Sequence, residues 1–262
     1  MDFGLRERVV LVCGASRGIA FAAADLLAQE GASLVIVSRS AGAVERAAQR
    51  LRVHGVSVLP IAADLATSDG TAHVRHVIMQ AHGRVDVLIT NTGGPPTGSA
   101  LGHAWEAWQR AAELLLRSAV ELTQAFVPGM QERQWGRVVG ITSFAVKQPV
   151  PSLVLSNSLR AAVTGFYRTL AEEVAPDGVT VNTVLPGYTA TERLDELATA
   201  TMQRTGSTRD AVFDRWRAET PARRLGAPEE VAAMIAFLAS AQAGFVTGQA
   251  ICVDGGAARS LL

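Results

Sequence analysis

Short apolar runs alternate with longer helical stretches along this chain, and that alternation restricts the fold more than any other feature. Most of the runs are continuously apolar, as expected for parallel strands that helices cover on both faces. The predicted strands are Val9–Cys13, Ser33–Ser38, Val56–Ala62, Val85–Thr90, Gly136–Thr142, Thr180–Leu185 and Ala250–Val253. The predicted helices are Ile19–Glu30, Ala41–His54, Ser68–His82, Trp105–Arg133, Ser152–Ala175 and Pro228–Ser240. We therefore predict an α/β fold: a single Rossmann-like, doubly wound parallel sheet of about seven strands with helices on both faces.

One stretch near the end of the chain interrupts this alternation of strands and helices. Thr191–Thr220 is polar, rich in arginine and threonine, and contains short amphipathic pieces such as Val212–Trp216. An insertion before the last helix and strand is typical of a mobile lid over a pocket. A length of 262 residues without linker or repeat suits one domain. We expect a single domain over 1–262 with a substrate lid at about 189–222.

Composition argues against several kinds of partner. The formal net charge is zero, so neither nucleic acid nor an anionic membrane surface is indicated. No apolar run reaches the ~18 residues of a membrane span, and the first eight residues lack the apolar core of a signal peptide. These features predict a cytoplasmic protein. The histidines are scattered without metal-ligand spacing, and Cys13 and Cys252 lie in predicted strands, which favours buried free thiols.

A glycine-containing turn follows the first predicted strand. Glycines there allow a tight turn and let backbone N–H groups approach a pyrophosphate at the start of the next helix. A strand–helix turn without any ligand has the same glycines, but the position between the first strand and the first helix strengthens the functional interpretation. The turn predicts a dinucleotide cofactor. The expected contacts in it are Gly14, Ser16, Arg17, Gly18 and Ile19.

The end of the second predicted strand bears on which dinucleotide binds. An NAD enzyme usually has an acidic residue there for the ribose 2′-hydroxyl, whereas this chain has Arg39. With Arg17, Arg39 suits a 2′-phosphate, because guanidinium groups offer positive charge and paired donors. The alternative is that both are solvated, since all but one of the 24 basic residues are arginine. We predict NADP in preference to NAD.

Two further turns follow predicted strands on the same edge. Asp64 and Leu65 come after the third strand, where a carboxylate can accept a hydrogen bond from the adenine amino group. Asn91 and Gly93 come after the fourth, within Asn91-Thr92-Gly93-Gly94, where small residues let the chain pass close to a cofactor. We expect all four to contact the dinucleotide.

The ordered set of motifs resembles the short-chain dehydrogenase/reductase family, particularly its 3-oxoacyl-carrier-protein-reductase-like members. The resemblance covers nearly the whole chain and implies a homotetramer or homodimer, with Asp254-Gly255-Gly256 near a tetramer contact. It also implies that Pro186, Gly187 and Thr189 lie against the nicotinamide and that Thr191 orders the lid. Besides the turns above, it rests on Ile141-Thr142-Ser143, Asn182 to Gly187, Arg224 to Glu230 and Val246-Thr247-Gly248-Gln249.

The chain departs from this family at its catalytic positions. The resemblance implies a set of Asn, Ser, Tyr and Lys, and these positions hold Leu115, Ser143, Ser156 and Arg160. A phenol beside a cation can give up a proton near working pH, whereas a serine hydroxyl is a much weaker acid and is shorter by an aromatic ring. Arg160 keeps the positive charge and can bind the nicotinamide ribose, but a guanidinium stays protonated.

Two other residues are candidates for the missing acid. Lys147 lies four residues after Ser143 on a loop at the predicted ligand edge, and Tyr188 follows Pro186-Gly187. The alternatives are a surface amine and a packing aromatic. In the interpretation we favour, Ser143 holds the substrate carbonyl. Ser156 takes part in proton transfer through a water molecule, together with Lys147 or Tyr188.

Three functions follow from these observations. The first is an NADP-dependent oxidoreductase that transfers hydride between NADPH and a small carbonyl or alcohol substrate. The second is a non-catalytic NADP-binding subunit or redox sensor, which the loss of three catalytic positions favours. The third is a lyase or dehalogenase on the same fold, which Arg160 would fit but the absent tyrosine and the intact glycine turn do not.

Overall fold

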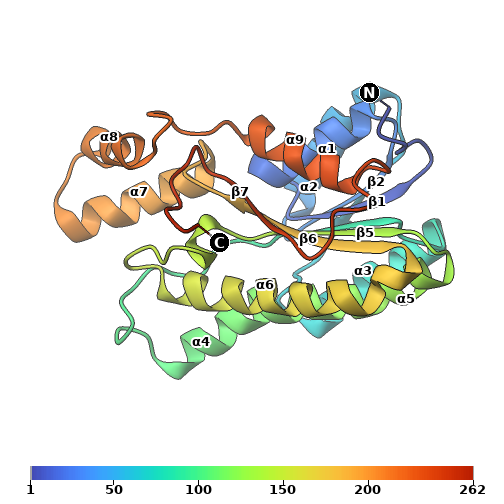
Figure 1. Cartoon of the computed structure of the whole chain (residues 1–262), viewed down its shortest axis with the longest axis horizontal. Helices are drawn as coiled ribbons and strands as arrows, with labels where there is room; N and C mark the ends of the chain where they lie inside the picture. The colour runs from blue at the N-terminus through green and yellow to red at the C-terminus, as the bar shows by residue number, and fades with distance from the viewer. Residues whose placement is uncertain (1, 262) are drawn as a thin grey trace.

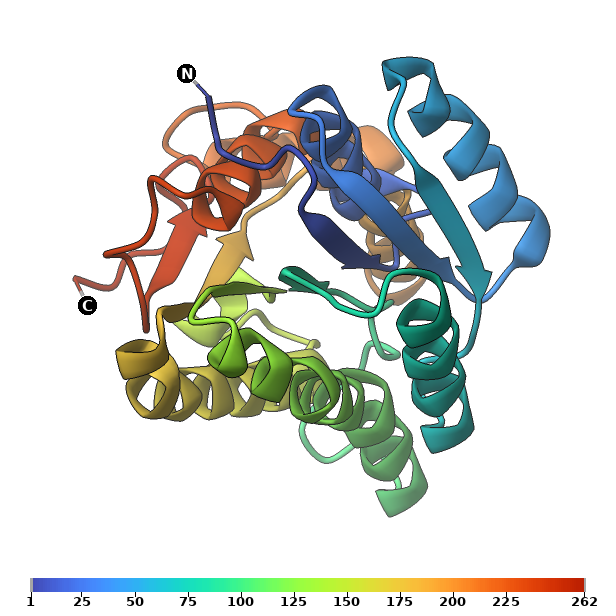
Figure 2. The ribbon, with the colours of Figure 1, turned by 90° about the vertical axis from the view of Figure 1, so that its right-hand side faces the viewer.

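A computed structural model describes residues 2–261 as one parallel sheet with helices on both faces. The strand order is β3-β2-β1-β4-β5-β6-β7, and every neighbouring pair is parallel. Figure 2 shows the strands between the two groups of helices. The predicted fold is confirmed. The strands are β1 Val9–Cys13, β2 Ser33–Ser38, β3 Val58–Ala62, β4 Val87–Thr90, β5 Gly136–Ile141, β6 Val179–Pro186 and β7 Ala250–Val253.

Two apolar cores, one on each face, explain the continuously apolar strands. Alternate side chains of β1 enter opposite cores, with Val10 and Val12 on one face and Leu11 and Cys13 on the other. The first core packs under α1 (Gly18–Gln29), α2 (Ala41–Leu51) and α9 (Pro228–Ala239). The second packs under α3 (Ser68–Ala81), α5 (Ser118–Glu132) and α6 (Val154–Val174), on the opposite side of the sheet (Figure 1).

The long helix predicted over Trp105–Arg133 is broken in the structure. It consists of α4 (Trp105–Ala112), a π-helical turn over Glu113–Arg117, and α5. A π turn carries an extra residue and changes which side chains share a face. Leu114 consequently lines a cavity, while Leu115 is buried.

The predicted lid contains two helices with a small core of their own. These are α7 (Glu192–Thr205) and α8 (Arg209–Glu219), which lie together at one end of the molecule (Figure 1). Their core is Leu194, Ala198, Val212, Phe213 and Trp216. A short parallel bridge between Thr189 and Gly226 joins the two ends of the segment at its base. The lid is therefore anchored at its base and packed internally.

Strand order reverses between β1 and β4, so the loops leaving their carboxyl ends diverge. Such a crevice is where doubly wound sheets bind ligands. Among residues 2–261, no helix has the length and apolar character needed to cross a membrane. Both cysteines are free thiols; Cys13 is buried as expected, whereas Cys252 is only partly buried because β7 is an edge strand.

Candidate active site

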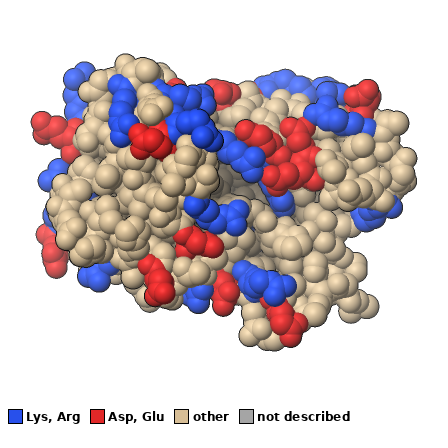
Figure 3. Space-filling view, turned by 180° about the vertical axis from the view of Figure 1, so that it is seen from behind, with Lys and Arg blue, Asp and Glu red and all other residues tan. Residues whose placement is uncertain are grey.

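A cavity of about 1090 Å³ opens at the carboxyl edge of the sheet. It is lined by the loops after β1, β2, β3, β4, β5 and β6, by α2, and by the start of α7. Seen from behind, the surface is hollowed between the lid side and the rest of the molecule, and basic and acidic side chains gather there (Figure 3). The cavity wall includes every cofactor-contact residue predicted from the sequence: Gly14, Ser16, Arg17, Gly18, Ile19, Arg39, Asp64, Leu65, Asn91, Gly93, Pro186, Gly187, Thr189 and Thr191.

The glycine turn has the geometry of an anion site. Gly14 and Gly18 adopt left-handed φ values of 65° and 62°, which side chains rarely adopt. A Cβ at residue 14 would lie only 2.6 Å from Asn91 Nδ2. Arg17 precedes α1 in an extended conformation and its side chain does not cap the helix, so the first N–H groups of α1 remain available. These residues therefore fit a dinucleotide pyrophosphate.

The end of β2 gathers arginines from two elements. Arg39 follows β2, and Arg46 and Arg50 project from α2 into the same cavity. None of the three pairs with an acidic side chain among the described residues. Sequence reasoning missed Arg46 and Arg50, although their spacing of four on a helix just after Arg39 places them on one face. This cluster suits a phosphate.

Hydroxyl groups and a guanidinium meet at the other end of the cavity. Arg160 donates from Nε to Ser156 Oγ at 3.2 Å, and from Nη1 to the carbonyls of Ile141 at 3.0 Å and Thr142 at 3.2 Å. Ser143 Oγ accepts from Ala145 N at 3.2 Å. Because both serine oxygens act as acceptors here, their own hydrogens can be donated into the cavity.

Burial, with the nearby charge of Arg193, lowers the pKa of Arg160 to about 10. The side chain therefore stays charged at neutral pH. Its positive charge lies beside Ser156, and a fixed charge of this kind can stabilise an oxyanion.

The structure does not bring Lys147 and Tyr188 to this cavity. Neither residue lines it. Tyr188 donates its hydroxyl to Glu219 at 3.0 Å and stacks on Trp216 at 5.3 Å, within the lid. Burial and Glu219 raise the pKa of Tyr188. The placement therefore gives no support to either residue as a proton donor.

The remaining tyrosine belongs to the core. Tyr167 is buried on α6, and its hydroxyl lies 2.8 Å from Thr90 Oγ1. Burial raises its pKa to about 12. Among the described residues that line the cavity, none is tyrosine, lysine, histidine or cysteine.

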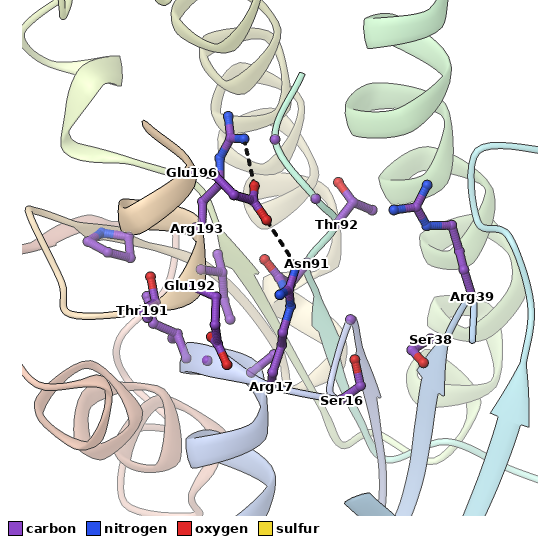
Figure 4. A pocket seen from close by; sticks show the side chains of 18 of the residues that line it. Ser16, Arg17, Ser38, Arg39, Asn91, Thr92, Thr191, Glu192, Arg193 and Glu196 are labelled. Atoms are coloured by element: carbon purple, nitrogen blue, oxygen red, sulfur yellow. Dashed lines mark hydrogen bonds and ion pairs between the residues drawn. The ribbon is translucent and has the colours of Figure 1, made fainter. Parts of the chain in front are cut away.

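A chain of polar contacts crosses the cavity mouth from the lid. Glu196 on α7 accepts from Arg17 Nη2 through Oε1 and from Arg193 Nη1 through Oε2, each at 3.1 Å. Arg193 Nη2 also donates to the carbonyl of Pro95 at 3.1 Å. Figure 4 shows Glu196 between the two arginines, above the glycine turn. Sequence reasoning missed Arg193 and Glu196, because the lid had no predicted orientation.

The doubly wound sheet, the glycine turn at its switch point and the hydroxyl–guanidinium cluster define a nucleotide-dependent oxidoreductase of the Rossmann type. A family model described as enoyl-(acyl carrier protein) reductase matches residues 14–258. The chain therefore belongs to the short-chain dehydrogenase/reductase family, as the sequence predicted, and is an enzyme of the oxidoreductase class.

Individual relatives support this assignment. The chain is 33% identical to the 3-oxoacyl-acyl-carrier-protein reductase FabG of Vibrio cholerae, over 96% of this chain and 98% of that protein. It is 34% identical, with a TM-score of 0.94 and complete coverage of both chains, to L-sorbose reductase from Gluconobacter frateurii complexed with NADPH and L-sorbose. It is 31% identical, with a TM-score of 0.93 and coverage of 97% and 98%, to actinorhodin polyketide ketoreductase with NADPH.

Proposed function

We propose that this protein is an NADPH-dependent reductase of a small carbonyl compound, or in reverse an oxidoreductase of the corresponding alcohol. The observation that carries the choice of NADP over NAD is the group of Arg39, Arg46 and Arg50, without acidic partners in the described chain, at the ribose end of the cavity. The NADPH complexes of L-sorbose reductase and actinorhodin ketoreductase support it. A cytoplasmic location and a homotetramer or homodimer remain predictions.

In this proposal, the residues at one end of the cavity bind the cofactor and those at the other end bind the substrate carbonyl. The glycine turn and the arginines would hold the dinucleotide, which supplies a hydride to a substrate carbonyl when bound. Ser143 and Ser156 donate hydrogen bonds to the carbonyl oxygen, and Arg160 fixes Ser156 while its charge offsets the charge that develops on that oxygen. Because serine is shorter than tyrosine, a water molecule beside Ser156 would pass the proton to the product.

Cofactor choice is tested by calorimetry with Arg39→Ala. Removing one charge-assisted phosphate contact should weaken NADPH binding about 10- to 100-fold, while NADH binding stays unchanged. Arg75→Ala, which removes an exposed arginine on α3, is the matched control. Equal losses for both dinucleotides would overturn the assignment of Arg39 to the 2′-phosphate.

Catalysis is tested by following NADPH oxidation with a panel of ketones and 3-oxoacyl compounds. We expect slow but saturable turnover, because a missing general acid forfeits about 10²–10⁴ in rate. Tight NADPH binding without turnover of any compound would contradict a reductase.

One observation favours a second function, a non-catalytic NADP-binding subunit or redox sensor. The described wall of the cavity has neither the tyrosine nor the lysine that the resemblance to the family implies for proton transfer. The double substitution Ser156→Tyr and Arg160→Lys separates the two functions. If the wild type is inactive and the double variant gains much activity, the sensor is favoured. If the wild type is active and the double variant loses that activity, a specialised reductase is favoured.

A further inference from the structure

The described wall of the cavity carries six arginines and three carboxylates, those of Asp64, Glu192 and Glu196, so it is positive overall. Arg160 and Arg193 both line it, and they lie close enough for Arg193 to lower the pKa of Arg160. Within residues 2–261, Arg160 has no acidic partner, and Arg193 shares the single carboxylate of Glu196 with Arg17. Two guanidinium groups that face one cavity in this way favour an anionic ligand, because partly buried charges need a counter-charge.

Both guanidinium groups also keep hydrogen-bond donors for such a ligand. A guanidinium carries five N–H donors in a planar fork. Arg193 uses Nη1 for Glu196 and Nη2 for Pro95. Arg160 uses Nε and Nη1, and no acceptor in the described chain contacts its Nη2. The remaining donors suit the two oxygens of a carboxylate.

Gly94 leaves room for the Arg193 guanidinium in this position. A Cβ at residue 94 would lie 2.3 Å from Nη2 and 2.5 Å from Cζ of Arg193. Gly94 does not have a left-handed φ, so glycine matters here because it has no side chain and not because of its conformational freedom. The guanidinium can therefore lie against the backbone after β4 and face the cavity from the lid.

The rest of the wall suits a short apolar body. Leu114, Leu153 and Leu197 line the same cavity, from the π-helical turn, the loop before α6 and the lid. On the basis of the proposed reductase function, we propose that the substrate is a carboxylic acid that also bears the reacting carbonyl or alcohol, and that Arg193 binds its carboxylate. The serines then hold the carbonyl at the other end of the molecule.

Matched pairs of substrates test this inference. Each 2-oxo or 3-oxo acid is compared with its methyl ester, which keeps the carbonyl and removes the charge. The wild type should favour the acid at least about 10-fold in kcat/KM, and Arg193→Gln should reduce kcat/KM for the acid about 10- to 100-fold with little effect on the ester. Arg204→Gln, on the exposed end of the same helix, is the control.

A binding measurement separates this inference from the proposed function. Butanoate has no ketone or aldehyde group to reduce, so its calorimetric titration into the enzyme with NADP⁺ reports the anion site alone. Binding that is lost in Arg193→Gln and absent for butanamide supports the site, even if no carbonyl compound is turned over. Equal turnover of acids and esters, with no butanoate binding, would overturn the inference and leave the reductase function intact.

Discussion

At the scale of single residues, Ser156 occupies the position where the resemblance to the family implies a phenol. Arg160 Nε donates to Ser156 Oγ at 3.2 Å, which directs the serine hydrogen away from the guanidinium. Serine gives up a proton far less readily than a phenol, but its hydroxyl can still donate a hydrogen bond. The site is therefore better suited to stabilise charge on a carbonyl oxygen than to supply a proton directly.

Ser156→Ala tests this role. We expect kcat for carbonyl reduction to fall about 10²–10³-fold, the usual loss when one donor to a developing oxyanion is removed. The Kd of NADPH should not change, because Ser156 lies at the opposite end of the cavity from the arginine cluster. Steady-state kinetics and fluorescence titration measure the two quantities. Ser158→Ala, exposed on the same helix, is the control, and an unchanged kcat in Ser156→Ala would remove this hydroxyl from the mechanism.

The spacing along the chain was sufficient to locate the cavity residues that follow strands. Ser143, Ser156 and Arg160 were predicted from the resemblance to the family, and the structure places all three on the cavity wall. Tyr188 could not be placed in this way, since its orientation depends on Trp216, which is distant in sequence but stacks on it in the lid. Arg193 was missed for the same reason, because only the folded chain brings it to Gly94.

At the scale of elements, the lid is tied to the glycine turn through one carboxylate. Glu196 on α7 accepts from Arg17, the residue that precedes α1. Arg17 was predicted to meet the 2′-phosphate, so Glu196 and that phosphate would compete for one guanidinium. We therefore expect the position of the lid and the binding of NADP to be coupled.

Glu196→Gln should therefore strengthen NADPH binding. Both partners of the Arg17–Glu196 pair are about half exposed, and such pairs contribute little, so the Kd should fall about two- to fivefold. NADH, which lacks the phosphate, should bind as before. Calorimetry with both dinucleotides measures this, with Asp210→Asn on α8 as control. Weaker NADPH binding would show instead that the pair closes the lid over the cofactor.

Element boundaries were predicted less well than element types. The strands and most helices begin and end within a few residues of their predicted limits, since apolar runs and glycine stops mark them. No apolar run or glycine in the sequence indicated the π-helical turn over Glu113–Arg117. Its consequence is that Leu114, rather than the aligned Leu115, faces the cavity.

At the scale of the whole molecule, a buried carboxylate joins distant parts of the chain. Asp86, which is 1% exposed, accepts from Val9 N at 2.9 Å and from Arg84 Nε at 3.1 Å. Arg133, at the end of α5, lies 3.6 Å from its other oxygen. The start of β1, the start of β4 and the end of α5 therefore depend on one side chain.

Asp86→Ala should destabilise the whole protein. It leaves the buried N–H of Val9 without its acceptor, whereas Arg84 and Arg133 keep their hydrogen bonds to the carbonyls of Glu7 and Val85. The cost of one unsatisfied buried group is about 1–3 kcal/mol. Urea unfolding followed by circular dichroism measures the loss. Glu132→Ala, an exposed position near the end of α5, is the control. A change below about 1 kcal/mol would mean that solvent or neighbouring groups replace the carboxylate.

The contact between Gly94 and Arg193 has a consequence for anyone who redesigns this protein. Any side chain at position 94 would take the volume of the guanidinium and push this flexible side chain elsewhere, so a change at residue 94 alters how Arg193 faces the cavity. Homologues that carry a bulkier residue after β4 should not present an arginine from the lid in this orientation, and their selectivity should differ accordingly. A covariation between these two sites across the family would mark the subset of enzymes that share this ligand preference.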